Sequence, residues 1–436
     1  MKILIATQPF AGHFNPTQPV AKELVRHGHD VVWMTGPSYE SRVTEVGARF
    51  VRMSDEAMIN NDEMEPDPGT SGLAKIVSML RKLFLDRVPA QVEDYQQLLE
   101  TFPADILLVE FATYGAHALH DLTGMPYATL GINPLVTLDP EIPPWGTGWQ
   151  PPKTVFRRLL NIAMHRAADW FFYSKMTAIL NSKRAELGLG PLPPGESFAT
   201  VVRSPILHLQ MSTPAFEFPR QNLSRSVKFV GPLLPLFDEA TFQPPDWWDT
   251  LLSHPRENVI HVTQGTVATQ PENLLKPAVQ ALSPRPDLLL VITGKDIDNL
   301  LFPNTPKPSN VLTSPFVPHA RLLPHVGVMV TNGGYNGVLA ALSAGVPLVC
   351  AGTTEDKADV CSRVAWSGAG VDLRTDAPSE RALADAVEEV MGDDRYRAAA
   401  ERVRDDFARH DGPVEVADEL ERVVGERRAR VVAGTA

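Results

Sequence analysis

Three short segments of this sequence combine residue types that could do chemistry, and the first contains a histidine. His13 lies in Phe10-Ala11-Gly12-His13-Phe14-Asn15-Pro16, shortly after the apolar run Ile3–Ala6. An imidazole titrates near neutral pH, so His13 could accept a proton from a substrate as a general base. The alternative is a loop histidine that caps a turn. Pro16 suits the first turn of a helix, which would end near His27.

The second segment is Val330-Thr331-Asn332-Gly333-Gly334-Tyr335-Asn336-Gly337, which joins an apolar run to a helical stretch that begins at Val338. Glycines at such a junction let a ligand approach the backbone closely. A helix N-terminus adds unpaired N–H groups and the positive end of the helix dipole. These features suit a phosphate, although an ordinary tight turn between strand and helix is the alternative.

The third segment, Val262-Thr263-Gln264-Gly265-Thr266, is a weaker phosphate candidate, in which the Thr266 hydroxyl and nearby N–H groups would hold an oxygen. The sequence contains neither GxxxxGK[ST] nor GxGxxG, which disfavours nucleotide triphosphate hydrolysis and dinucleotide redox chemistry. The two cysteines, Cys350 and Cys361, form no CxxC pattern. We therefore expect no disulfide framework and no metal site.

The composition narrows the class of partner. The chain is 44% hydrophobic and carries a formal net charge of -12, so a nucleic-acid or anionic-membrane partner is not expected, although a local basic patch could bind a phosphate. The apolar run at the N-terminus is too short for a signal peptide, and no segment offers about 18 uninterrupted apolar residues. The cytoplasm is therefore the default compartment.

The elements that must position these segments are short apolar runs alternating with helical patterns in both halves of the chain. Nearly continuous Val, Ile and Leu strands followed by helices indicate parallel strands covered on both faces, and hence two doubly wound α/β domains. In such folds ligands bind at the carboxyl ends of the strands, which is where His13 would lie. The runs are Ile3–Ala6, Val31–Met34, Ile106–Val109, Tyr127–Leu130, Val259–Val262, Leu288–Ile292, Val326–Val330 and Pro347–Cys350.

The predicted domain division follows the loss of periodicity after residue 213. Residues 1–213 form the first domain, residues 214–236 a linker rich in Pro, Ser and charge, and residues 237–410 the second domain. Residues 411–436 are expected to form a helix that packs back on the first domain. The Pro-rich stretch 140–152, with Trp145 and Trp149, is predicted to be a long functional loop.

Taken together, these segments resemble the UDP-glycosyltransferase family, particularly its bacterial natural-product (macrolide-type) branch, over essentially the whole chain. The resemblance is densest in four blocks between Phe316 and Asp359. These are Phe316-Val317-Pro318-His319, Asn332-Gly333-Gly334-Tyr335-Asn336-Gly337, Gly345-Val346-Pro347 and Glu355-Asp356-Lys357. The segment from Gly12 to Pro16 matches the family's N-terminal catalytic segment. The resemblance implies the GT-B architecture, in which two Rossmann-like domains lie across a cleft, with the acceptor in the first and the donor in the second.

The resemblance also implies roles for individual residues. His13 would be the general base, and Glu110, where the family usually has Asp, would orient it, with Asp121 as a spare carboxylate. In the donor site Phe316 would stack on the base and Asp356 would bind sugar hydroxyls. The full set of implied donor-binding residues is Gly265, Thr266, Phe316, Val317, His319, Asn332, Gly333, Gly334, Asn336, Gly337, Asp356 and Lys357.

Three positions depart from the family pattern. Asn332 replaces a usual His, Lys357 a usual Gln, and Ala340 the acidic residue that binds the ribose hydroxyls. Each loss is expected to weaken donor binding by about 1–3 kcal/mol where nothing substitutes. The nucleotide sugar is therefore left as UDP-glucose or a dTDP-deoxysugar.

The implied reaction is inverting, metal-independent transfer of a sugar from this co-substrate, with no other cofactor, to a hydroxyl of a small apolar natural product. The acceptor would be lined by apolar side chains of the first domain and of the Trp-containing loop, for which ordinary core packing is the alternative. These candidates are Phe14, Met79, Phe84, Phe111, Trp145 and Trp149. Two rival functions are a sugar-nucleotide epimerase and a non-catalytic partner or activator protein. A homodimer is also compatible with the sequence.

Overall fold

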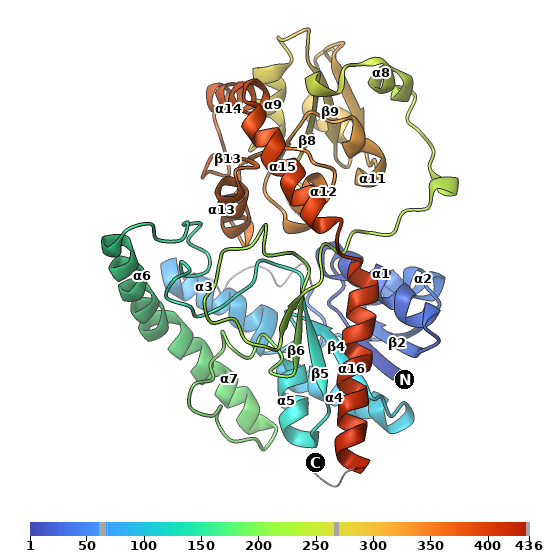
Figure 1. The fold of residues 1–436 in the computed structure, drawn as a ribbon, viewed down its shortest axis with the longest axis vertical. Coiled ribbons are helices and arrows are strands. Elements are labelled where there is room, and N and C mark those ends of the chain that lie inside the picture. The colour runs from blue at the N-terminus through green and yellow to red at the C-terminus, as the bar shows by residue number, and fades with distance from the viewer. Residues whose placement is uncertain (61–66, 68, 266–269, 433–436) are drawn as a thin grey trace.

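The computed structural model describes residues 1–60, 67, 69–265 and 270–432, and it contains two domains stacked along the long axis of the molecule (Figure 1). The predicted pair of doubly wound domains is confirmed, because each domain is built on one sheet whose strands all pair in parallel. All eight predicted apolar runs lie in strands or overlap them. No described helix is long and apolar enough to cross a membrane.

The N-terminal sheet has seven strands, and β1 lies where the strand order reverses. In spatial order these are β3 (Arg49–Arg52), β2 (Asp30–Thr35), β1 (Lys2–Ala6), β4 (Ile106–Glu110), β5 (Tyr127–Gly131), β6 (Leu207–Gln210) and β7 (Val227–Phe229). The helices of this domain are α1 (Ala11–Arg26), α2 (Glu40–Glu45), α3 (Gly72–Leu80), α4 (Val88–Thr101), α5 (Gly115–Thr123), α6 (Val155–Ala168) and α7 (Ser174–Glu186). Single turns of 3-10 or π-helix are Pro37–Tyr39, η3 (Arg81–Leu85) and η4 (Asp169–Tyr173).

The C-terminal sheet has six strands, and β8 lies where its order reverses. In spatial order these are β10 (Val311–Ser314), β9 (Leu289–Thr293), β8 (Val259–Thr263), β11 (Val328–Thr331), β12 (Leu348–Cys350) and β13 (Gly370–Asp372). The helices are α8 (Trp248–Ser253), α9 (Leu275–Leu282), α10 (Ile297–Leu301), α11 (His319–Leu322), α12 (Tyr335–Ser343), α13 (Lys357–Ser367), α14 (Glu380–Gly392), α15 (Asp394–Phe407) and α16 (Gly412–Val432). Further 3-10 turns are Glu239–Thr241, Arg256–Asn258 and Leu323–His325.

Alternate residues of the central strands explain why both faces of each sheet are covered. In β1, Ile3 and Ile5 belong to a core cluster with α1 and α16, whereas Leu4 belongs to the opposite cluster with α4, α5 and α7. In β8, Val259 and Ile260 likewise belong to different core clusters on opposite faces of the C-terminal sheet. A strand with both faces buried must be apolar throughout, and this pattern is the one that the sequence shows.

Two chain crossings join the domains, and the predicted linker 214–236 is wrong in part. Strand β7 lies inside that range and pairs with β6, so the N-terminal domain extends at least to Phe229. The segment that follows β7 toward the C-terminal domain contacts the segment that returns between α15 and α16, since a Cβ on Gly231 would lie 2.5 Å from the His410 Cβ. After this return, α16 runs along the N-terminal domain beside α1, where Glu421 bonds to His27 and His29 (Figure 1).

The start of α1 also differs from the prediction. The helix begins at Ala11, so His13 lies in its first turn and Pro16 lies inside it. Proline has no backbone N–H, and an α-helical N–H at this position would bond to the carbonyl four residues earlier. Pro16 therefore leaves the Gly12 carbonyl without its helical partner. That carbonyl instead accepts a hydrogen bond from the Asn336 Nδ2 of the other domain, at 3.2 Å.

Candidate active site

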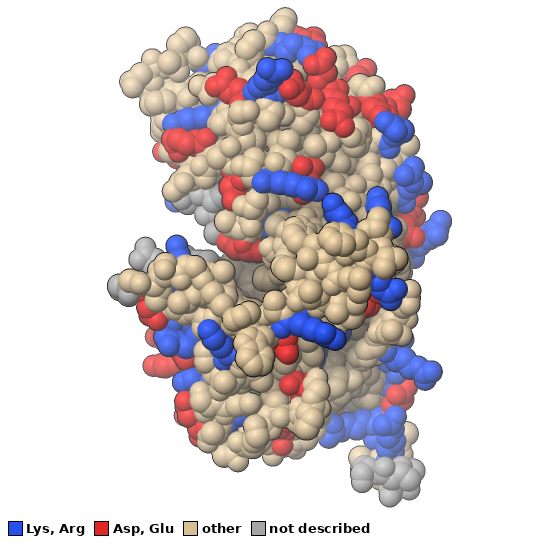
Figure 2. Space-filling view, turned by 90° about the vertical axis from the view of Figure 1, so that its left-hand side faces the viewer, with Lys and Arg blue, Asp and Glu red and all other residues tan. Residues whose placement is uncertain are grey.

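The points of strand reversal in the two sheets lie opposite each other across a cleft, which appears as a hollow between the two lobes in Figure 2. The segments after β1 and β4 come from one side, and those after β8 and β11 from the other. The Asn336–Gly12 bond joins the first turn of α12 to that of α1. The Gln210 Nε2 also donates to the Tyr335 hydroxyl at 3.2 Å. Ligands of doubly wound folds bind at such reversal points.

His13 and Glu110 form a pair at the N-terminal side of this cleft. The Glu110 side chain is buried at the end of β4, where its Oε1 accepts from the Gln8 N–H at 3.1 Å and its Oε2 from the Ala112 N–H at 2.6 Å. The Oε2 lies 3.1 Å from the His13 Nδ1, although the ring N–H is not aligned for a hydrogen bond. Glu110 therefore reaches the imidazole despite its extra methylene. A proton held on Nδ1 leaves Nε2 as the basic atom.

An aromatic group (Phe10, Phe84, Phe111) surrounds this histidine. The Phe10 and Phe111 rings lie 5.7 and 6.1 Å from the His13 ring, and Phe84 lies 5.7 Å from Phe111. Met79 packs with the same three rings on a small buried cluster. The structure thus brings three of the acceptor candidates together beside His13. Phe10 was missed by the sequence reasoning, although it lies three residues before the histidine.

Phe14 is not available to an acceptor, which corrects the prediction for that residue. Its side chain is fully buried, stacked at 4.3 Å on both Trp33 and Tyr39 under the Arg42 guanidinium. The cause is the early start of α1, because a helix beginning at Ala11 turns residue 14 toward the sheet while His13 stays partly exposed.

The two tryptophans lie on the predicted long loop, which crosses to the other domain. Trp149 is exposed, whereas the Trp145 indole N–H is buried without a hydrogen-bond partner among the described residues. Between them the Gly146 N–H donates to the Asp359 Oδ2 of α13 at 2.6 Å. The loop is therefore attached to the same helix whose N-terminus carries the predicted sugar-binding pair.

The turn before α12 has the features that an anion site needs. Gly333 has a φ of +81°, and a Cβ there would lie 2.4 Å from the Cys361 Sγ, so only glycine fits. Gly334 is the N-cap and provides no side chain, which leaves the first N–H groups of α12 for a ligand. The Asn332 Nδ2 donates to the Gln264 carbonyl at 2.6 Å and so ties this turn to the segment after β8. Gly265 lies at this junction, and Thr266 lies outside the described residues.

The remaining donor candidates lie around the same end of the sheet. Phe316 is 75% exposed, as a stacking platform requires, and Val317 beside it is buried. Burial lowers the pKa of His319 to about 4, so this ring is neutral at pH 7; a Cβ on Gly337 would lie 3.9 Å from it. The family's acidic position is Ala340, whose buried methyl group offers no hydrogen bond.

The predicted sugar-binding pair begins α13. Burial raises the pKa of Asp356, the N-cap residue, to about 6, although Lys357 opposes the shift. The Lys357 ammonium is paired with the Glu355 carboxylate. In this structure Lys357 is therefore ion-paired with Glu355, whereas the Asp356 carboxylate can accept hydrogen bonds from hydroxyl groups.

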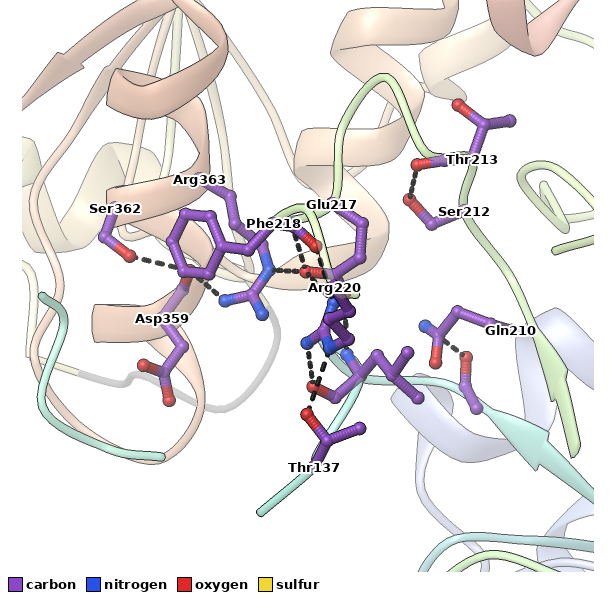
Figure 3. Close-up of polar contacts among 12 residues, drawn as sticks. Thr137, Gln210, Ser212, Thr213, Glu217, Phe218, Arg220, Asp359, Ser362 and Arg363 are labelled. Carbon is purple, nitrogen blue, oxygen red and sulfur yellow. Dashed lines mark hydrogen bonds and ion pairs between the residues drawn. The ribbon is translucent and has the colours of Figure 1, made fainter. Parts of the chain in front are cut away.

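An interdomain charge cluster (Glu217, Arg220, Arg363) holds α13 against the N-terminal domain (Figure 3). The Arg363 Nε bonds to the Glu217 carboxylate, and Arg220 lies 3.5 Å from it, with all three side chains no more than 4% exposed. Burial by itself would raise the pKa of Glu217, but the two guanidinium groups and two backbone N–H groups hold it below its ordinary value. The sequence reasoning missed this cluster, in which Glu217 and Arg220 lie within the predicted linker and Arg363 lies on α13.

The described residues contain one group of three metal-ligand side chains, His27, His29 and Glu421, and it belongs to the α1–α16 contact. No Asp-x-Asp motif was expected when metal independence was predicted, but the sequence contains one, Asp296-Ile297-Asp298. The Asp298 carboxylate accepts from the Thr313 hydroxyl at 2.7 Å and from the Lys307 ammonium at 3.1 Å. Both partners bond to the same oxygen, Oδ1.

Comparisons with known proteins match the C-terminal part of the chain to one family and nearly the whole chain to individual relatives. Residues 296–423 match the family described as Erythromycin biosynthesis protein CIII-like, C-terminal domain. The 4'-demethylrebeccamycin synthase of Lentzea aerocolonigenes is 38% identical over 427 residues, which are 97% of this chain and 99% of that protein. The solved calicheamicin glycosyltransferase CalG4 has a TM-score of 0.74 at 22% identity, over 97% of this chain and 98% of that one. A spinosyn rhamnosyltransferase complexed with thymidine diphosphate has a TM-score of 0.68 at 18% identity, over 97% and 100%.

The solved structures share the two-domain GT-B fold with this chain. The identity with the synthase extends over nearly all of both proteins. The chain therefore belongs to the UDP-glycosyltransferase family, in its bacterial natural-product branch, and it is a glycosyltransferase that uses a nucleotide sugar.

Proposed function

We propose that this protein transfers a sugar from a nucleoside diphosphate to a hydroxyl of a small apolar natural product, with inversion at the anomeric carbon. The observation that carries the proposal is the Asn336–Gly12 bond, which joins the first turn of α12 to the turn that contains His13. A base and an anion site come from different domains and lie together across the cleft. Such an arrangement suits a displacement in which a proton leaves one reactant and a diphosphate leaves the other.

In the proposed step the acceptor oxygen forms a bond to the anomeric carbon while the bond from that carbon to the diphosphate oxygen breaks. The His13 Nε2 takes the acceptor proton, and Glu110 stabilises the imidazolium that results. The N–H groups at the start of α12 stabilise the departing diphosphate. A single displacement inverts the configuration. Because backbone groups balance the leaving charge, the proposed step includes no metal ion.

The acceptor is proposed to bind against the aromatic group beside His13. Phe10, Phe84, Phe111 and Met79 provide an apolar wall on which a rigid aglycone would bury its surface. For the donor, UDP-glucose and dTDP-deoxysugars are both proposed, because Ala340 removes the ribose ligand that the family usually has. Among the solved relatives, the spinosyn rhamnosyltransferase binds thymidine diphosphate, which supports a nucleoside diphosphate here.

The test is a product assay by mass spectrometry, with UDP-glucose and dTDP-sugars as donors and a panel of apolar aglycones as acceptors. We expect a new glycoside, and a loss of about 100-fold or more in turnover for His13→Ala. His254→Ala is the matched control, because this histidine bonds to a carbonyl on the surface of the C-terminal domain. Near-normal turnover in His13→Ala would remove the base from the mechanism, and full activity after EDTA treatment is expected.

Two other results would replace the proposal. An isomerised nucleotide sugar without any glycoside would identify an epimerase. Nucleotide binding without turnover of any donor, together with activation of a second glycosyltransferase, would identify a non-catalytic partner protein.

A further inference from the structure

A helical rod on the N-terminal domain presents its apolar side to solvent. The rod runs through α6, η4 and α7, from Val155 to Glu186. Its first half carries six large apolar side chains that are between 41% and 77% exposed, which we call the outward apolar face. These residues are Val155, Phe156, Leu159, Leu160, Trp170 and Phe171. Contiguous exposed apolar residues of this size mark an interaction site on a folded protein.

The orientation of α6 is the reverse of that of an ordinary surface helix. Its apolar residues recur at spacings of three and four, which places them on one side. The opposite side is polar and contacts the protein, since the Asn161 Nδ2 bonds to the Ile142 carbonyl at 2.9 Å and the His165 Nε2 lies 2.7 Å from the same oxygen. An amphipathic helix that docks by its polar side keeps its apolar side for another partner.

Charge on the rod indicates what that partner is. Between residues 155 and 175 there are four basic residues and one acidic residue, Asp169, in a chain whose net charge is -12. Arg158 pairs with Glu141, whereas Arg157, Arg166 and Lys175 form no ion pair with any residue that the structure describes. By helical spacing, Arg157 lies at the edge of the apolar side, and Arg166 lies on that side, four residues before Trp170. Aromatic and leucine side chains flanked by arginine are typical of helices that lie in the interface of an anionic bilayer.

We propose that the outward apolar face docks the protein onto the surface of an anionic lipid membrane. The apolar side chains enter the boundary between headgroups and acyl chains, and the unpaired cations contact lipid phosphates. A second copy of the chain fits less well, because an isologous interface would bring the same unpaired cations together across a two-fold axis. The proposal departs from the expectation based on net charge, because these basic residues are concentrated on one rod.

The experiment is co-sedimentation of the full chain with vesicles of phosphatidylcholine alone or with 30% phosphatidylglycerol (about a third anionic lipid, enough for a clear surface potential). We expect binding to the anionic vesicles that weakens at high salt, and a loss of about tenfold or more in partitioning for the double variant Phe156→Ser/Trp170→Ser. Leu252→Ser is the matched control, because Leu252 is 51% exposed on α8 of the other domain. The double variant Arg157→Gln/Arg166→Gln should lose the preference for anionic vesicles.

Unchanged melting temperatures are expected for these surface variants, so a folding defect is separated from a docking defect. No binding to anionic vesicles by the wild-type chain would overturn the proposal, as would equal binding to both vesicle types. Light scattering after size exclusion provides a second criterion. A dimer that Phe156→Ser/Trp170→Ser converts to a monomer would show that a second copy covers the face instead of lipid.

Discussion

Removing the Arg363 guanidinium from the interdomain charge cluster is the most informative perturbation of this fold. In Arg363→Met the side chain keeps most of its apolar length but leaves the Glu217 carboxylate without its main partner. The carboxylate then retains Arg220 at 3.5 Å and the backbone N–H groups of Leu135 at 2.8 Å and Phe218 at 2.9 Å. Glu217 is 1% exposed at its side chain, so water does not replace the lost contact.

The expected cost follows from these contacts. Breaking a buried ion pair by removing one partner typically costs about 3–5 kcal/mol, since the other charge stays buried. The remaining cation and two N–H groups place this case at the lower end, at about 3 kcal/mol. Met also loses the cation–π contact of Arg363 with the Phe218 ring, whose centroid lies 4.2 Å away. The double variant Glu217→Gln/Arg363→Met should cost less, because it leaves no buried charge unpaired, although the single amide oxygen can keep only one of the two N–H bonds that the two carboxylate oxygens accept.

The assay is urea denaturation followed by tryptophan fluorescence and circular dichroism. The deficit of Arg363→Met should shrink as pH falls. In the wild-type fold the pKa of Glu217 is held low, so its contribution is present above the ordinary glutamate pKa and is lost as pH falls through the folded value. A cost below about 1 kcal/mol at pH 7, or additive single and double variants, would contradict the coupling argued here.

Three further outcomes are expected. Phe14→Leu should destabilise the fold by about 1–3 kcal/mol and leave the KM for the acceptor unchanged, whereas Phe111→Leu should raise the KM for the acceptor. A raised acceptor KM in Phe14→Leu would show that Phe14 belongs to the acceptor site. Gly333→Ala should abolish nucleotide binding measured by calorimetry, because the new Cβ would collide with the Cys361 Sγ and the residue has a φ of +81°. Retained affinity for the nucleotide would exclude this turn as the diphosphate site. The kcat/KM for the donor should fall as pH drops below about 6, where Asp356 protonates, and Asp356→Asn should remove that dependence. The same raised pKa means that the contribution of Asp356 to the unfolding free energy decreases as pH rises from 3.8 to 6. An unchanged pH profile in the variant would assign the titration to another group.

The strands at the centre of each sheet could be predicted from the sequence, and the remaining strands could not. Ile3–Ala6 and Val259–Val262 are apolar at every position or nearly so, because both of their faces are buried. Strands β3, β7, β10 and β13 lie at sheet edges, and β3 and β7 carry Arg49, Arg52 and Lys228. Strands β3, β7 and β13 are partly exposed, so their polar residues hide the pattern, whereas β10 is buried but ends in Thr313 and Ser314. β6 is internal, but His208 and Gln210 interrupt its apolar run and bond to each other inside the core.

The site could be predicted where local chain chemistry determines it, and could not where residues far apart in sequence meet. The glycine turn before α12 is identifiable because a φ of +81° and a close sulfur exclude other residues. Glu110 was predicted from the family resemblance and not from local chemistry, and the structure places it at the end of the buried strand β4. The burial of Phe14 and the charge cluster depend on helix phase and on domain docking. Neither leaves a periodic pattern in the sequence.

Pro16 affects the active site although it does not mark the start of the helix, as the sequence suggested. The residue suits a first helical turn, yet it lies inside α1, where its missing N–H leaves the Gly12 carbonyl free for Asn336 of the other domain. The resulting bond holds the first turn of α12 beside His13. The Asn336 amide is therefore already used in the contact between the two domains. The proposed diphosphate site depends instead on the backbone N–H groups at the start of α12. A donor that needs the Asn336 amide must break this bond when it binds, which would couple donor binding to the separation of the two domains.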